Sequence, residues 1–419
     1  MNERVIGTSR PRHDAVLQVT GKVIYADDFT RPGMLYAKAL RSQHAHAKIL
    51  SIDTSRAERL PGVKGIITAE DVPKNRFGFT HLDQPVLAGD KVRYRGDALA
   101  VVAAESWEAV TEALDLIKVK YQSLPAVFDP IEAMKEDAPK VHGDSNIASH
   151  IKIRNGNIEE GWRLADEIIE DTIRTQMVEH SHLEPHAAVA EVAPGGGYTV
   201  WSAMQRPFLV ASDLSKVLQF PMNKIRVIAT AIGGGFGGKN EMTVEPYICL
   251  LAAKTGRPVK MVFTREDEFQ ASTVRHPYIT KYKSGVKRDG TLVARQVEII
   301  SDSGAYVSWG ESTLSKASIH AAGPYRIPHV RIDGYLVYTN NNVGGAMRGF
   351  GVPQVGFAYE CHTDNIAAVL GIDPLEFRLK NILVDNSSLP TGQVLEIVTL
   401  KETIKKAVDL VGWKREVSF

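Results

Sequence analysis

A glycine-rich segment at residues 231–240, Ala-Ile-Gly-Gly-Gly-Phe-Gly-Gly-Lys-Asn, holds the residues of this chain best suited to bind a cofactor. It places five glycines in six positions, and a backbone without Cβ atoms can approach a bound group closely. An apolar stretch, residues 225–232, precedes it, and a helical pattern begins at Glu241. Between a strand and a helix, such a loop presents free amide groups to an anionic or electron-rich ligand. We therefore predict a cofactor cradle at residues 233–239.

Three other interpretations of this segment stay open. The spacing Gly233-x-Gly235-x-x-Gly238 fits a dinucleotide-binding loop, but the nearest acidic ribose partners, Glu266 and Asp267, lie roughly 30 residues further on instead of about 20. Residues 233–239 also fit a P-loop, except that Asn240 stands where Ser or Thr would hold Mg²⁺. The third interpretation is a tight turn without a ligand, although such a turn needs only one or two glycines.

A histidine cluster, His-Ser-His-Leu-Glu-Pro-His at residues 180–186, contains further candidates for chemistry. His182 and His186 have the i, i+4 spacing of a metal-binding pair on a helix, but Pro185 disfavours a helix there. A strand would instead place His180, His182 and Glu184 on one face.

Composition excludes several classes of protein. The 419 residues carry 50 basic and 49 acidic side chains without a basic cluster, so nucleic-acid binding is not expected. The first residues lack a signal-peptide pattern and no apolar stretch is long enough to span a membrane, which predicts a cytoplasmic protein. The only cysteines, Cys249 and Cys361, lie in apolar helical patterns and are expected to be buried thiols. Since an iron–sulfur cluster normally needs four cysteine ligands, this chain cannot hold one alone.

The elements that must position these residues follow an α/β pattern. Residues 98–103, 107–117 and 117–121 predict a strand, a helix and a strand, and the Pro-containing residues 126–150 predict a surface linker. Beyond it, β-branched stretches at 168–169, 198–201, 225–228, 259–263 and 293–300 predict strands that alternate with helices at 208–218 and 247–254. A second glycine-rich loop, residues 344–351, precedes a helical stretch at 354–370, and residues 400–411 predict an amphipathic helix.

Four ordered segments resemble the molybdenum hydroxylases of the xanthine dehydrogenase and aldehyde oxidase family: residues 180–186, 201–207, 233–239 and 346–354. Arg-His-Pro at 275–277 and Tyr-Arg-Ile-Pro at 325–328 fall between them as in the family, and residues 20–28 are similar to its hammerhead domain. The resemblance implies a mixed α+β fold: a hammerhead α/β domain at 1–125, a linker at 126–150 and the first molybdopterin-binding domain at 151–419. It also marks residues 180–186 as a structural strand, so no side chain is expected to ligate a metal.

The resemblance assigns roles to individual residues. It implies that Gln205 donates its amide to an oxo ligand of molybdenum, while Phe236 and Gly237 bring backbone to the cofactor. Arg348 would contact the metal and the pterin, and Phe350 would stack on a flat heteroaromatic substrate. Each residue type also has an ordinary structural role, as a cap, a core aromatic or a loop arginine. The implied cofactor is a molybdenum–molybdopterin cytosine dinucleotide with a terminal sulfido or selenido ligand.

The resemblance also implies partners. In the family, the glutamate that acts as general base lies in a second molybdopterin-binding half, so we expect no catalytic residue on this chain and a second molybdopterin subunit that supplies this base. Electrons would pass to an iron–sulfur subunit and an FAD subunit, and then to NADP. A molybdenum protein divided between two chains resembles the nicotinate dehydrogenases of anaerobic bacteria, with this chain as the large molybdopterin subunit.

Two substrate positions depart from the purine-oxidising relatives. Asn240 stands where those relatives carry a glutamate, and Lys316 aligns with their arginine. A lysine could pair with the carboxylate of nicotinate, although a single lysine is more often a solvated surface residue. The expected reaction is therefore hydroxylation of nicotinate to 6-hydroxynicotinate. The alternatives are a purine- or aldehyde-oxidising subunit, a non-catalytic nucleotide-binding or assembly module, and an NAD-dependent enzyme.

Overall fold

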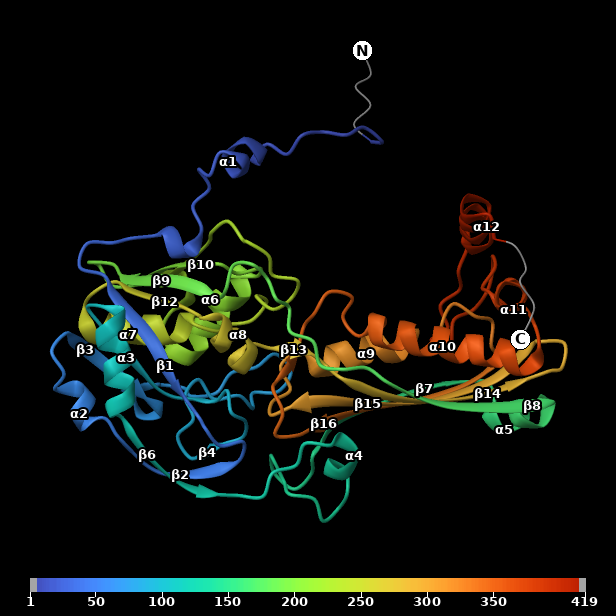
Figure 1. Ribbon diagram of the computed structural model, residues 1–419, viewed down its shortest axis with the longest axis horizontal. Coiled ribbons are helices and arrows are strands. Elements are labelled where there is room, and N and C mark those ends of the chain that lie inside the picture. Colours follow the sequence, from blue (N-terminus) through green and yellow to red (C-terminus); the bar gives the residue numbers. More distant parts are fainter. Residues whose placement is uncertain (1–5, 414–419) are drawn as a thin grey trace.

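The computed structural model describes residues 6–413, which form two sheet-based layers side by side (Figure 1). The larger sheet has seven strands. In spatial order they are β11 (Ile225–Ala229), β10 (Tyr198–Ser202), β9 (Ala187–Val192), β12 (Val259–Val262), β1 (Leu35–Arg41), β5 (Ala98–Ala104) and β3 (Val63–Thr68). Strands from residues 35–104 thus share one sheet with strands from residues 187–262, because β1 pairs in parallel with β12.

Strand β5 explains how this sheet is covered on both faces. All seven of its residues are buried. Val101 and Ala103 face the core formed with α7 (Glu245–Thr255), whereas Val102 and Ala104 face α3 (Trp107–Leu116). Because alternate residues of a strand point to opposite faces, a continuous run of small apolar residues serves two helix layers.

Smaller elements complete this part of the molecule. A three-stranded sheet has the order β4 (Lys91–Val92), β2 (Ala47–Asp53) and β6 (Lys118–Ser123). The helices are α1 (Ala15–Val19), α2 (Ser55–Glu58), α6 (Pro207–Leu218) and α8 (Arg265–Ala271), with short 3₁₀ turns η1 (Ala26–Asp28), η2 (Ala69–Asp71) and η3 (Met222–Lys224).

The second sheet has five strands in the order β7 (Ile147–Asn155), β16 (His329–Tyr338), β15 (Leu292–Gly304), β14 (Tyr278–Val286) and β8 (Glu167–Arg174). Helices α9 (Gly310–His320) and α10 (Val352–Leu370) cover one face, and α4 (Pro130–Ala133) and α5 (Ile158–Leu164) lie on the other (Figure 1). Helices α11 (Pro374–Asn381) and α12 (Leu400–Val411) follow at the far end of α10. Residues 126–150, expected as a surface linker, contribute α4 and bury Val127, Ala133 and Val141 in this second core.

A two-stranded ladder positions the start of the second glycine-rich loop. Strand β13 (Val274–Arg275) pairs in parallel with β17 (Gly344–Gly345), which begins the second glycine-rich loop. The first loop leaves the edge strand β11 and returns into α7. The helical pattern expected from Glu241 is delayed in the structure, because α7 begins only at Glu245 with Pro246 in its first turn.

Candidate cofactor site

The two glycine-rich loops touch each other and enclose one side of an open hollow of about 290 Å³. The backbone N–H of Arg348 donates to the Phe236 carbonyl at 2.8 Å. A Cβ atom placed on Gly237 would lie 2.5 Å from the Ala346 carbonyl oxygen, so only glycine permits this approach. The hollow is lined by Gln205, Phe236, Gly237, Asn240, Ala346, Met347, Arg348, Gly349 and Phe350.

Both loops hold an aromatic residue in a strained backbone conformation. Phe236 has φ 51° and Phe350 has φ 54°, in the left-handed region that residues with a Cβ rarely adopt. Phe236 is also 46% exposed, although it is a large apolar side chain. Strain of this kind costs about 1–3 kcal/mol and is concentrated at ligand-binding sites. The two phenylalanines are therefore placed at the hollow at an energetic cost to the fold.

The side-chain amide of Gln205 contacts the first loop through its oxygen and leaves its nitrogen available in the hollow. It lies just before α6, which starts at Pro207, and its Oε1 accepts the Gly237 N–H at 3.0 Å. Among residues 6–413, its Nε2 finds no acceptor. Its oxygen is therefore used by the fold, and its two N–H groups remain free to donate to a ligand.

Several backbone amides of the first loop are also left without an acceptor among the described residues. Within the described part of the chain, the N–H groups of Gly235 and Phe236 donate to no oxygen, although Gly235 is buried. Buried amides in folded proteins are almost always paired, so unpaired ones indicate a partner from outside the chain.

A buried ion pair holds the first loop from beneath. Lys239 Nζ lies 2.8 Å from Glu184 Oε2, and the same oxygen accepts the Gly233 N–H at 2.7 Å. The Lys239 side chain is fully buried, which lowers its pKa, while Glu184 opposes that change. One carboxylate thus ties both ends of the loop together.

A second ion pair holds the loop at Gly238. The His186 ring contacts the Gly238 carbonyl through Nε2 at 3.1 Å and Glu268 through Nδ1 at 2.9 Å. Burial disfavours both charges, but each stabilises the other, so the pKa of His186 is raised and the pKa of Glu268 falls to about 2. Both ring nitrogens of a protonated His186 therefore donate, one to the loop and one to the carboxylate.

The segment 180–186 is not the strand that we expected. Its backbone is irregular, with Ser181 at φ 49°, and β9 starts only at Ala187. Pro185 and the need to reach beneath the glycine loop explain this departure. The His180 ring lies 2.8 Å from the Ala346 carbonyl through its Nε2, so this segment also touches the second loop.

The cluster of His182, His186 and Glu268 has ligand atoms within 4.8 Å of one another, a spacing that a metal ion could use. The two ring nitrogens of His182 have no hydrogen-bond partner in the described chain, and burial lowers the pKa of the ring. However, both nitrogens of His186 are already engaged, one by Glu268 and one by Gly238. We therefore interpret the cluster as a support for the loop.

The remaining predicted residues differ in their position. Asn240 and Arg348 line the hollow, and the guanidinium of Arg348 makes no ion pair with any described residue, while its carbonyl accepts from Arg275 at 2.8 Å. Lys316 is an exposed residue of α9 and does not line the hollow. The structure thus brings Gln205, Phe236, Gly237, Asn240, Arg348 and Phe350 together and leaves Lys316 outside.

The same geometry disfavours two alternatives. A P-loop lysine must reach phosphates, but Lys239 is buried against Glu184. A dinucleotide loop opens directly into a helix and uses a free acidic residue. Here α7 begins at Glu245, and Asp267 caps α8 and pairs with Arg41.

Sequence reasoning missed the residues that support the loop, namely Glu184, His186, Glu268 and Arg275. Glu184 and His186 stand within a motif whose histidine spacing suggests a metal pair instead. Their pairing with Lys239 and Glu268 spans 55 and 82 positions, so no local signal could identify it.

Comparison with known proteins gives the class of protein to which this chain belongs. Residues 141–382 match the family described as molybdopterin cofactor-binding domain, and residues 20–125 match aldehyde oxidase and xanthine dehydrogenase, a/b hammerhead domain. The chain therefore belongs to the molybdopterin-binding family of the aldehyde oxidases and xanthine dehydrogenases. The predicted fold, a hammerhead domain followed by a molybdopterin-binding domain, is confirmed.

Three individual proteins show how similar this chain is to members of the family. The nicotinate dehydrogenase large molybdopterin subunit of Eubacterium barkeri is 40% identical over 418 residues, which cover 98% of each chain. A probable xanthine dehydrogenase protein of Bacillus subtilis (strain 168) is 41% identical over 416 residues, which cover 97% of this chain and 56% of that one. The solved quinoline 2-oxidoreductase from Pseudomonas putida 86 has a TM-score of 0.92 at 29% identity and matches 98% of this chain and 54% of its own.

The chain thus spans about half the length of the Bacillus and Pseudomonas proteins and nearly all of the Eubacterium one. None of the helices among residues 6–413 combines the length and apolar character needed to cross a membrane.

Proposed function

We propose that this chain is the molybdopterin-binding subunit of a molybdenum hydroxylase that acts on an N-heteroaromatic acid, with nicotinate converted to 6-hydroxynicotinate. The observation that carries the proposal is the hollow between the two glycine loops, where Gln205 keeps a free amide donor. The 40% identity to a nicotinate dehydrogenase subunit along both whole chains supports the choice of substrate.

The residues present fit a molybdenum–pterin cofactor. Such a group carries oxo and sulfur ligands that accept hydrogen bonds. The hollow offers three donors that lack a partner among the described residues: Gln205 Nε2, the Phe236 amide and the Arg348 guanidinium. When bound, the molybdenum centre supplies transfer of a water-derived oxygen to an electron-poor carbon together with uptake of two electrons. We propose the cytosine dinucleotide form with a terminal sulfido or selenido ligand.

The chain's own residues would position the cofactor and the substrate and would stabilise negative charge. Gln205 would donate to an oxygen on which negative charge develops, and its orientation is fixed because its Oε1 is held by Gly237. Phe236 and Gly237 would hold the cofactor through the backbone, and Arg348 would offset negative charge at the metal and the pterin. Phe350, whose ring packs edge-on against Trp309 with 6.2 Å between centroids, offers an aromatic face to a flat substrate.

Asn240 and Lys316 are the proposed substrate-selecting residues. Asn240 lines the hollow and is neutral, which suits a substrate without the polar pattern of a purine. Lys316 lies on α9, whose Thr313 and Ala317 pack against Gly351 of the second loop. A lysine here could pair with a carboxylate that reaches beyond the hollow.

We propose that the remaining functions lie on partners: a second molybdopterin subunit with the general-base glutamate, an iron–sulfur subunit and an FAD subunit. The nicotinate dehydrogenase relative is itself named as one subunit of a larger enzyme.

A substrate panel on the purified complex tests the proposal. Nicotinate, xanthine and an aromatic aldehyde would be compared as substrates in the presence of an artificial electron acceptor. The product of each would be identified by mass spectrometry. The proposal predicts the highest kcat/KM for nicotinate, with one oxygen from labelled water in the product. Preference for xanthine would favour the alternative that the Bacillus relative suggests, and preference for the aldehyde would favour the aldehyde-oxidising alternative. No turnover of any of them by a molybdenum-loaded complex would refute the proposed activity.

A further inference from the structure

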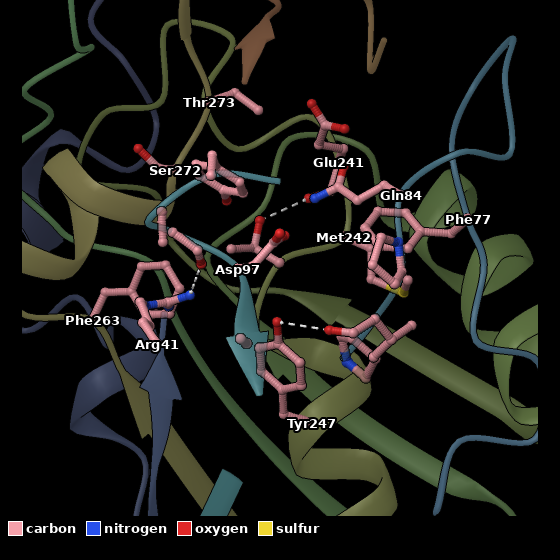
Figure 2. Close-up of a pocket in the computed structure, with 18 residues that line it drawn as sticks. Arg41, Phe77, Gln84, Asp97, Glu241, Met242, Tyr247, Phe263, Ser272 and Thr273 are labelled. Atoms are coloured by element: carbon pink, nitrogen blue, oxygen red, sulfur yellow. Dashed lines mark hydrogen bonds between the residues drawn. The ribbon is translucent and has the colours of Figure 1, made fainter. Parts of the chain in front are cut away.

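A second, polar cavity lies beside the cofactor hollow, where the hammerhead strands meet the segment that follows the first glycine loop (Figure 2). It measures about 40 Å³, which is room for on the order of three water molecules. Its walls carry the charged groups Arg41, Asp97 and Glu241 together with the hydroxyls of Ser272 and Thr273. A cavity with this many polar groups in its walls is suited to hold water.

Several of these groups lack a partner. Arg41 donates to the Gly96 carbonyl at 3.0 Å and pairs with Asp267 at 3.3 Å, but its Nη2 is buried and unpartnered among the described residues. The Thr273 hydroxyl is likewise buried without a partner in the described chain. Because buried polar groups are hydrogen-bonded in folded proteins, ordered water in the cavity is the natural partner.

Glu241 stands between this cavity and the cofactor hollow. Its neighbour in sequence, Asn240, lines the hollow, whereas Glu241 itself lines the cavity. Its Oε1 accepts from the Ser308 hydroxyl at 2.5 Å. The residue after Ser308 is Trp309, whose ring packs against Phe350 in the wall of the hollow. Glu241 is therefore the direct neighbour of one hollow residue, Asn240, and is connected to another, Phe350, through Ser308 and Trp309.

Burial, more than the surrounding charges, raises the pKa of the Glu241 carboxyl. Burial, with Asp213 and Asp83 nearby, raises the pKa of Glu241 to about 7, although the hydrogen bond from Ser308 and the charge of His186 act in the opposite direction. Across the cavity, burial raises the pKa of Asp97 to about 6, while Asp97 accepts from the Tyr306 hydroxyl at 2.9 Å. Arg41 is the cation that faces the cavity.

We propose that Glu241 is a proton-relay residue that takes protons released at the cofactor hollow and passes them to water in the polar cavity beside Asp97. This inference rests on the proposed hydroxylation. Converting a C–H bond and water into a C–OH bond releases two protons and two electrons. The electrons leave through the bound molybdenum centre to an iron–sulfur acceptor, and the protons need a separate route to solvent. The Glu241 carboxylate accepts a proton on the side of the hollow and releases it to cavity water.

The first test compares wild type with Glu241→Gln in the intact, molybdenum-loaded complex. Glutamine keeps the size and the contact with Ser308 but cannot exchange a proton. We expect kcat to fall by about tenfold or more, with KM changed less than about twofold, and the rise of kcat with pH near 7 to disappear. Glu241→Asp should restore part of kcat, and its kcat should depend on pH with a shifted profile. The exposed Glu70→Gln serves as the matched control and should behave as wild type.

The second test needs no turnover. Infrared difference spectra of wild type should contain a protonated-carboxyl band that vanishes as the pH rises through about 7, and Glu241→Gln should lack that band. A wild-type kcat and pH profile in Glu241→Gln, or the absence of the band, would overturn the relay while leaving the proposed function intact. A wild-type complex without molybdenum and without activity would instead overturn the proposed function, and the relay with it.

Discussion

In the side-chain amide of Gln205, one atom supports the fold and the other is available for function. Its Oε1 accepts the Gly237 N–H, and its Nε2 has no acceptor in the described chain. Gln205→Glu keeps an oxygen for Gly237 and removes the free donor. We expect the free energy of unfolding to change by less than about 1 kcal/mol and kcat to fall by about 10²-fold, since loss of one positioned donor costs roughly that much. Urea unfolding and steady-state kinetics measure the two effects.

The exposed Gln122→Glu, on β6, is the control for the added charge. Equal losses of stability and activity in Gln205→Glu would mean that Gln205 acts only through the fold.

Gly237 tests the contact between the two loops. An alanine there would place its Cβ 2.5 Å from the Ala346 carbonyl, in a backbone with φ 107°. We expect Gly237→Ala to push the loops apart and to reduce the molybdenum content of the purified protein at least several-fold, as measured by elemental mass spectrometry. Gly256→Ala shares a positive φ, 67°, but has open space around the added atom. If both variants lose molybdenum equally, backbone strain and not loop contact is responsible.

At the scale of elements, the glycine loop is held by an ion pair between the irregular segment before β9 and helix α8. Glu268 has a pKa of about 2, well below the unfolded value of 4.5, because the cost of burial is outweighed by His186. Its contribution to stability is therefore present above pH 4.5 and is lost as the pH falls toward 2. We expect the free energy of unfolding to fall by on the order of 3 kcal/mol over this pH range. In Glu268→Gln, the free energy of unfolding should depend less steeply on pH. Thermal unfolding from about pH 2 to about pH 5 measures it.

The exposed Glu70→Gln should keep the wild-type slope in the same experiment. An unchanged slope in Glu268→Gln would show that other carboxylates dominate acid unfolding.

The sequence predicted regular elements better than the segments that support the site. Strand β5 and helix α3 were predictable because a buried apolar run and a 3.6-residue pattern are local signals. The segment 180–186 was predicted as a strand and is irregular, since its shape is set by the distant residues Lys239 and Glu268. Six of the seven proposed site residues line one hollow. Five of them belong to segments with a family resemblance and Asn240 directly follows such a segment, whereas Lys316, which like Asn240 rested on alignment alone, lies apart from these segments in the sequence.

At the scale of the whole molecule, the cofactor hollow opens outward beside two separately cored sheets. The hollow is open among the described residues, and the longer relatives contain about as much chain again. This arrangement favours the proposed second molybdopterin subunit as the other wall. The polar cavity of Glu241 lies within the part of the molecule that is built on the seven-stranded sheet.

The most direct test of the central claim is the molybdenum and pterin content of this protein, purified without tags from its native host with its co-purifying chains. The account predicts molybdenum and a pterin nucleotide near one per chain, with a second molybdopterin-type subunit in the same complex. A metal-free, pterin-free monomer that gains neither when supplied with both would contradict it.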